Sequence, residues 1–168
     1  VLGRALSDGY RDKIVLATKF GQTQLDGGGM GVDGRPEYVI EACEKSLQRL
    51  GVNEIDLYFQ HRVDKNVPIE DTVGAMAKLV EQGKVRAIGI CEAKPATIRR
   101  AHATHPLAAV QSEFSIMYRV EAEQIYETTA ELGISFVAYS PLGRGLLTDQ
   151  YLMADSVDEN DPHHKHPR

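Results

Sequence analysis

Reactive and hydrogen-bonding side chains follow short apolar segments at several points along this sequence. They are Lys19, His61, Cys91 with Glu92, Gln111, and Tyr139 with Ser140. If the apolar segments are parallel strands, their carboxyl ends meet at one edge of a sheet, where α/β proteins gather functional groups. A buried lysine lowers the pKa of a neighbouring acid, and a histidine can donate a hydrogen bond or a proton to a substrate oxygen.

Each of these side chains also has an ordinary structural interpretation. Lys19 can be a solvated charge, His61 a satisfied histidine at a strand end, and Cys91 a small buried hydrophobe. Tyr139 can belong to the core. A functional interpretation therefore depends on whether the fold brings all of these side chains together at one edge of the sheet.

The apolar pattern predicts alternating strands and helices. Buried strands are expected at residues 13–18, 55–59, 85–90, 107–110 and 134–139. Amphipathic helices are expected at residues 36–50, at 69–80, from 95 to just before Pro106, and at 122–132. Proline opens two of these helices and glycine closes three of them, as is typical of helix ends.

Alternation of strand and helix requires a parallel sheet, which leaves two architectures. An open doubly wound sheet usually carries a G-x-G-x-x-G turn after a strand, and none occurs here. The pattern therefore favours a (β/α)8 barrel. Because a whole barrel needs about 250 residues, the fold class expected of this chain is a partial (β/α)8 barrel of about five parallel strands.

Composition excludes several classes of protein. The chain has 168 residues, 42% of them hydrophobic and 26% charged, with a net charge of -5. One soluble domain is expected, with neither nucleic acid nor a membrane as its partner. Two cysteines and no signal-peptide pattern at the start of the sequence predict a reducing, cytoplasmic location.

Three further motifs are weak. Residues 27–34 are rich in glycine but lack the Lys-Ser/Thr of a phosphate loop, so we expect a flexible surface loop. His163, His164 and His166 do not have the spacing of metal ligands, so no metal site is expected. No G-x-S-x-G nucleophile turn supports hydrolase chemistry.

Written out together, the segments around the strand ends resemble the aldo-keto reductase family. The matching segments, which keep that family's order and spacing, are ATKFG at 17–21, SLQRLG at 46–51, QHRVD at 60–64, GKVRAIG at 83–89, VQSE at 110–113 and AYSPLGRG at 138–145. The similarity extends over nearly all of the sequence. It implies a (β/α)8 barrel that binds NADP(H) and reduces small aldehydes and ketones by hydride transfer.

The resemblance also implies individual roles. Lys19 corresponds to the lysine that lowers the pKa of a catalytic tyrosine, and His61 to the histidine that orients the carbonyl. Gln111 would bind the nicotinamide carboxamide, and Tyr139 would stack on its ring. Cys91 takes the place of a serine that helps to hold the carboxamide. The remaining cofactor-binding residues would be Ser140, Pro141, Leu142, Gly143 and Arg144.

The family's catalytic aspartate and tyrosine lie upstream of the segment that residues 1–7 resemble. Tyr10 does not replace the tyrosine, because it precedes the first strand and belongs at the amino-terminal face of the barrel. Residues 1–168 are therefore expected to form an incomplete aldo-keto reductase domain that is inactive alone. Two alternatives remain open: a noncatalytic cofactor-binding subunit like the β subunits of potassium channels, and a nonfunctional remnant.

Overall fold

Strands and helices alternate along most of the chain in the computed structural model, which describes residues 1–7 and 9–149. Within these residues a five-stranded parallel sheet has the order β1-β4-β5-β6-β7. Its strands are β1 (Ala17–Phe20), β4 (Ile55–Gln60), β5 (Val85–Cys91), β6 (Ala109–Glu113) and β7 (Ser135–Tyr139). The predicted α/β fold with about five parallel strands is confirmed.

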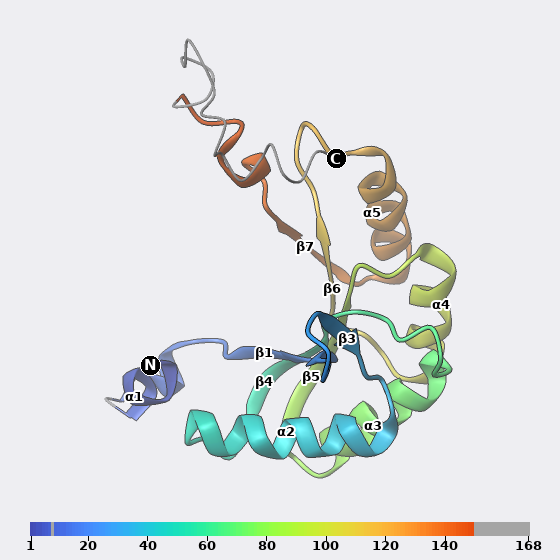
Figure 1. Ribbon diagram of the computed structural model, residues 1–168. Helices are drawn as coiled ribbons and strands as arrows, with labels where there is room; N and C mark the ends of the chain where they lie inside the picture. Colours follow the sequence, from blue (N-terminus) through green and yellow to red (C-terminus); the bar gives the residue numbers. More distant parts are fainter. Residues whose placement is uncertain (8, 150–168) are drawn as a thin grey trace.

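Four helices connect the strands of this sheet and cover one of its faces. They are α2 (Pro36–Leu50), α3 (Ile69–Glu81), α4 (Pro95–Thr104) and α5 (Val120–Leu132). Figure 1 shows the helices along the convex outer side, with the concave side open between β1 and β7. Shorter elements flank the sheet: α1 (Leu2–Ser7), η1 (Arg11–Lys13) and η2 (Gly143–Gly145). No helix in the described part of the chain is long and apolar enough to cross a membrane.

α2 has the bounds that the sequence predicts, because both of its ends carry strong local signals. Pro36 is the first helical residue, where its missing N–H costs no hydrogen bond. Gly51 ends the helix at φ 67, and its N–H donates to the Leu47 carbonyl at 2.9 Å. This left-handed cap favours glycine. The buried residues Val39, Cys43 and Leu47 form the face that packs on the sheet.

The two faces of the sheet carry separate apolar clusters. Side chains on the helix-covered face, such as Tyr58, Ile88, Ile90 and Val110, belong to the larger cluster together with residues of the helices. Phe59, Cys91 and Ala109 form a second cluster on the concave face, with Leu57 and Val137 packed against it. Successive residues of a strand point to opposite faces, which explains the division.

Gly89 allows the concave cluster to pack closely. It pairs with Phe59 on one side and with Ala109 on the other. A Cβ at position 89 would lie 2.5 Å from Cε1 of Phe59 and 2.6 Å from the Ala109 carbonyl oxygen. The Phe59 ring therefore lies where any larger residue on β5 would place its side chain.

The first strand differs from its predicted position. Residues 13–18 were expected to form it, but β1 covers Ala17–Phe20 and η1 occupies Arg11–Lys13. Of the apolar residues before β1, Leu16 is buried, whereas Ile14 and Val15 are 42% and 77% exposed. The apolar run does mark a segment that approaches the sheet. The strand begins only where the backbone reaches β4, with Ala17 opposite Leu57.

The sequence predicted a flexible surface loop at residues 27–34, and this prediction is only partly correct. β2 (Gln22–Gln24) pairs antiparallel with β3 (Met30–Val32), so part of the segment is a hairpin strand. The N–H of Asp33 donates to the Gly21 carbonyl at 2.8 Å and closes the base of the hairpin. Each of these strands has only three residues, so the sequence shows no alternation of apolar and polar residues that would predict a strand.

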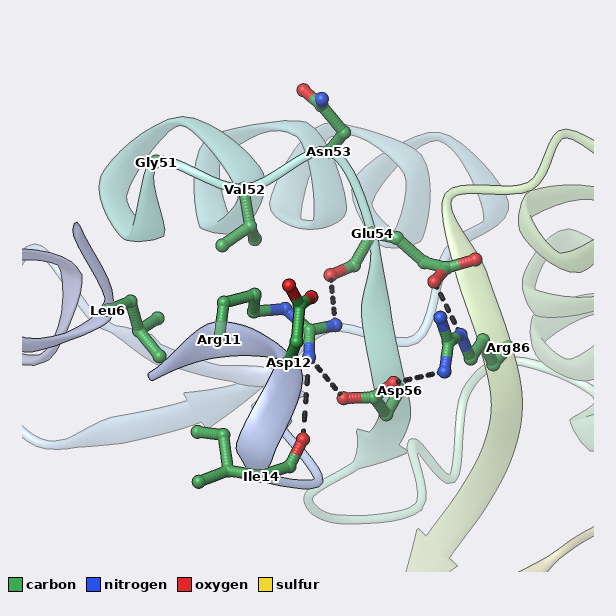
Figure 2. Close-up of a pocket in the computed structure, with 10 residues that line it drawn as sticks. All are labelled: Leu6, Arg11, Asp12, Ile14, Gly51, Val52, Asn53, Glu54, Asp56 and Arg86. Carbon is green, nitrogen blue, oxygen red and sulfur yellow. Dashed lines mark hydrogen bonds and ion pairs between the residues drawn. The ribbon is translucent and has the colours of Figure 1, made fainter. Parts of the chain in front are cut away.

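A polar cluster joins three segments at the amino ends of the strands (Figure 2). Asp56 Oδ2 accepts from Arg11 Nη1 at 2.8 Å and from the Leu16 N–H at 2.7 Å. Arg86 Nη1 lies 3.2 Å from Asp56 Oδ1, and Arg86 Nε lies 2.5 Å from Glu54 Oε1. The charged groups of Arg11, Glu54, Asp56 and Arg86 line a cavity of about 530 Å³, at the opposite end of the sheet from the predicted site.

Burial is the largest influence on the Asp56 carboxyl and raises its pKa. The hydrogen bonds from Arg11 and Leu16, with the charges of Arg11 and Arg86, more than offset that effect, so the pKa of Asp56 is lowered from its ordinary value. The carboxylate is thus a charged, buried junction between the segment before β1 and the start of β4 and β5.

Candidate active site at the carboxyl ends of the strands

Lys19 and His61 lie at the carboxyl ends of neighbouring strands. Lys19 is the third residue of β1 and pairs with Phe59, whose ring belongs to the concave cluster. Its Nζ is 6.0 Å from the centroid of that ring. His61 directly follows β4, and its N–H donates to the Phe20 carbonyl at 2.8 Å. Both residues also line a cavity of about 210 Å³ between β1 and α2.

The electrostatics of His61 reflect this proximity. Burial lowers the pKa of its imidazole, and the positive charges of Lys19 and then Arg62 lower it further. His61 is therefore neutral at neutral pH. One ring nitrogen of a neutral imidazole carries a hydrogen and can donate a hydrogen bond, while the other accepts one.

The same register aligns the other predicted site residues. Cys91 is the last residue of β5 and pairs with Gln111, which lies within β6 rather than after it, because β6 begins later than predicted. Tyr139 is the last residue of β7 and pairs with Glu113. Since paired residues share a face, Lys19, Cys91, Gln111 and Tyr139 all lie on the concave face near the carboxyl ends.

Cys91 is a protonated thiol at neutral pH. It is 2% exposed, and burial raises its pKa to about 11 against the opposing charge of Lys19. A thiolate is the reactive form of cysteine, so this side chain is a poor nucleophile. It can act as a weak hydrogen-bond donor or as packing.

The chain turns sharply after β7. Ser140 and Arg144 have left-handed backbones, at φ 51 and 58, and the Gly143 N–H donates to the Ser140 carbonyl at 2.9 Å. Pro141 and Leu142 are exposed at the turn. The Arg144 guanidinium lies 3.7 Å from the Glu113 carboxylate. The segment 140–144 therefore starts at the rim, the edge of the sheet formed by the carboxyl ends of the strands, and an ion pair links it to Glu113 at the end of β6.

A group of polar residues at the rim received no role from the sequence. Arg62 Nη1 lies 3.3 Å from Glu92 Oε2, and Glu92 Oε1 accepts from the Glu113 N–H at 2.9 Å. The only signal was position, because Arg62 and Glu92 follow His61 and Cys91 directly and Glu113 ends β6. His163, His164 and His166, for which no metal site is expected, lie outside the described residues.

These features define an α/β protein with a partial (β/α)8 barrel and polar groups collected at the carboxyl ends of its strands. The sequence profile of the "Aldo/keto reductase family" matches residues 1–167, so the chain belongs to the aldo/keto reductase family. It is 51% identical over 168 residues to "Probable aldo-keto reductase 1" of Glycine max. The chain spans 48% of that relative's length.

Solved structures agree with this assignment. The glycerol dehydrogenase of Gluconobacter oxydans superposes with a TM-score of 0.89 at 29% identity, over 99% of this chain and 52% of the other. An aldo-keto reductase of Bacillus halodurans in its holo form gives a TM-score of 0.80 at 31% identity, over 95% of this chain and 52% of the other. The described strands and helices thus correspond to about half of a longer barrel in each case.

Proposed function

We propose that these residues are part of an NADP(H)-dependent oxidoreductase that reduces small aldehydes and ketones to alcohols. The observation that carries the proposal is the placement of Lys19 and His61 together at the carboxyl ends of β1 and β4 in a member of this family. The similar glycerol dehydrogenase of Gluconobacter oxydans supports chemistry between an alcohol and a carbonyl.

His61 would orient the substrate. Because burial and nearby cations keep its imidazole neutral, the ring can donate a hydrogen bond to a carbonyl oxygen without giving up a full proton. Such a bond strengthens as negative charge develops on that oxygen, and it therefore favours the transition state over the ground state.

Lys19 would tune the acid. Its ammonium group lowers the pKa of any phenol beside it, which allows a tyrosine to donate a proton near neutral pH. The family's tyrosine and aspartate are expected upstream of residues 1–7. For that reason we propose that residues 1–168 by themselves do not reduce carbonyl compounds.

The side chains on the concave face near the carboxyl ends include the hydrogen-bonding groups and the aromatic ring that a nicotinamide cofactor would need. The half-buried Gln111 amide can both donate to and accept from a carboxamide, and Cys91 beside it is a weaker partner. The Tyr139 ring is half-buried at the end of β7, where it can stack on a planar ring. Residues 140–144, including Arg144, would hold the phosphates. When bound, the cofactor supplies the hydride.

Two further proposals concern the setting of the protein. Cys43 and Cys91 are both buried free thiols, which supports a reducing, cytoplasmic location. The net charge of -5 supports a small-molecule substrate over nucleic acid or an anionic membrane as the partner.

Cofactor binding and turnover test the proposal separately. NADPH fluorescence should change on titration with the 168-residue chain, and Gln111→Ala should weaken the binding about tenfold. The full open reading frame that encodes this sequence should oxidise NADPH when a small aldehyde is added. There, Lys19→Met and His61→Ala should each lower kcat by at least about 100-fold with little change in NADPH affinity. Aldehyde-dependent oxidation that both variants retain in full would contradict the assigned roles.

A further inference from the structure

Glu92, to which the sequence assigned no role, is bonded to residues at the ends of neighbouring strands. It follows β5, and its backbone N–H donates to the Gln111 carbonyl at 2.9 Å. Its side-chain Oε1 accepts from the Glu113 N–H at 2.9 Å and lies 3.4 Å from the Ser112 hydroxyl. Glu92 is thereby bonded to β6 through both its backbone and its side chain.

The other carboxylate oxygen of Glu92 faces the segment after β4. Oε2 lies 3.3 Å from Nη1 of Arg62, the residue after His61. Tyr139, the last residue of β7, pairs with Glu113, whose N–H donates to Glu92, and its hydroxyl lies close enough to Glu92 and Arg62 for both to shift its pKa. One carboxylate thus contacts groups from the ends of β4 and β6 and lies near the Tyr139 hydroxyl at the end of β7, while it is itself fixed at the end of β5.

The backbone of Glu92 is in a conformation that needs support. Its φ of 53 lies in the left-handed region, which residues with a side chain rarely adopt. The turn aims the carboxylate across the strand ends, where Glu113 and Arg62 bind it. The contacts and the unusual backbone therefore depend on each other.

We propose that Glu92 is a positioning residue that holds the Arg62 guanidinium and the Tyr139 ring in place at the rim. The inference rests on the proposed function for the consequence that Tyr139 is held where a nicotinamide ring would stack. Its structural part, the control of Arg62 and Tyr139 by one carboxylate, can be measured without any cofactor.

The groups around the Tyr139 hydroxyl determine in which direction each substitution should shift the pKa of Tyr139. Burial raises the pKa of Tyr139 most, the hydrogen bond and charge of Glu92 and the charge of Glu113 raise it further, and the hydrogen bond with Arg62 lowers it. Arg144 lies beside Glu113, at 3.7 Å. Removing the charge of Glu92 must lower the pKa of Tyr139, whereas removing Arg62 must raise it.

The test follows the ring of Tyr139 by carbon-13 NMR in the tyrosine-labelled 168-residue chain, with Tyr139→Phe to assign the signal. Spectra are compared over the pH range in which circular dichroism shows the chain to be folded. Deprotonation of Tyr139 should begin at lower pH in Glu92→Gln and at higher pH in Arg62→Met. The effect of Arg62→Met should shrink in the Glu92→Gln background, because Arg62 is then no longer held beside the ring.

Glu70→Gln is the matched control, since Glu70 also pairs with an arginine, Arg100, but does so on the exposed surfaces of α3 and α4. It should leave the Tyr139 titration unchanged. A Tyr139 titration that is the same in Glu92→Gln as in the unaltered chain would overturn the proposal, as would an undiminished effect of Arg62→Met in the double variant.

NADPH binding separates this inference from the proposed function. Glu92→Gln should weaken binding about tenfold while the fold, followed by circular dichroism, is retained. If neither the unaltered chain nor the product of the full open reading frame binds NADPH, the proposed cofactor is wrong, yet the NMR titration still decides whether Glu92 positions the two groups. If the chain binds NADPH and Glu92→Gln binds it equally well, the positioning role toward the cofactor is refuted and the proposed function stands.

Discussion

The positive charge of Lys19 acts on the imidazole of His61 across the ends of two adjacent strands, β1 and β4. The two residues are far apart in sequence, and the parallel pairing of β1 with β4 brings them together. Burial and this charge together lower the pKa of His61, so the imidazole stays neutral under conditions in which an exposed histidine near pKa 6.5 begins to ionise.

Lys19→Met should therefore raise the pKa of His61 toward its ordinary value. NMR titration of the imidazole ring protons measures the midpoint directly. Lys78→Met, which removes an exposed lysine from the last turn of α3, is the control and should leave the midpoint unchanged. Because His61 takes up its proton less readily in the folded chain, stability is lost as the pH falls below about 6.5, and this loss should be smaller in Lys19→Met. Identical midpoints with and without Lys19 would refute the electrostatic contact.

Asp56→Asn should destabilise the chain by about 2 kcal/mol at pH 7, because it removes a buried charge that holds Arg11 and the Leu16 N–H. The pKa of Asp56 is lowered in the folded state, so its contribution is present above about pH 4 and is lost as the pH falls through the folded pKa. Urea unfolding monitored by circular dichroism should therefore show a weaker acid dependence in the variant. Glu131→Gln, which breaks the exposed pair with Arg99, should change stability little.

Gly89→Ala should destabilise the chain by about 1–3 kcal/mol, because its Cβ would overlap the Phe59 ring and the Ala109 carbonyl. Gly74→Ala is the matched substitution within α3, where a Cβ meets no atom within 4 Å. It should stabilise the chain by about 0.5–1 kcal/mol through helix propensity. Thermal unfolding of both variants measures the difference, and a Gly89→Ala chain as stable as the unaltered chain would show that the close contact at Gly89 is absent.

Both thiols should resist modification while the chain is folded. Cys43 and Cys91 are buried, and burial raises the pKa of each to about 11, so very little thiolate exists at neutral pH. A thiol-specific reagent should react at least about 100-fold faster in urea than in buffer. Cys43→Ala and Cys91→Ala assign the two reactions. Fast labelling of Cys91 in the folded chain would mean that the end of β5 opens readily.

Local signals predicted some elements well and others poorly. Pro36 and Gly51 define α2 by themselves, since proline suits a first turn and glycine suits a left-handed cap. By contrast, Ile14 and Val15 look like strand residues but precede β1, because apolarity shows that a segment approaches the core and not where its pairing begins. The β2–β3 hairpin is short and rich in polar residues and glycine, so no periodic pattern marks it.

The sequence alone determined the alternation of strands and helices, the parallel sheet that this alternation requires, and the residues near its carboxyl end, including Lys19, His61 and Tyr139. Only the tertiary structure decided which of those residues touch. Glu92 could not be linked to Arg62 and Tyr139 beforehand, because the link depends on the register of four strands and on one left-handed backbone turn. Periodicity and turn residues act locally along the chain, whereas register is settled by packing between segments that are distant in sequence.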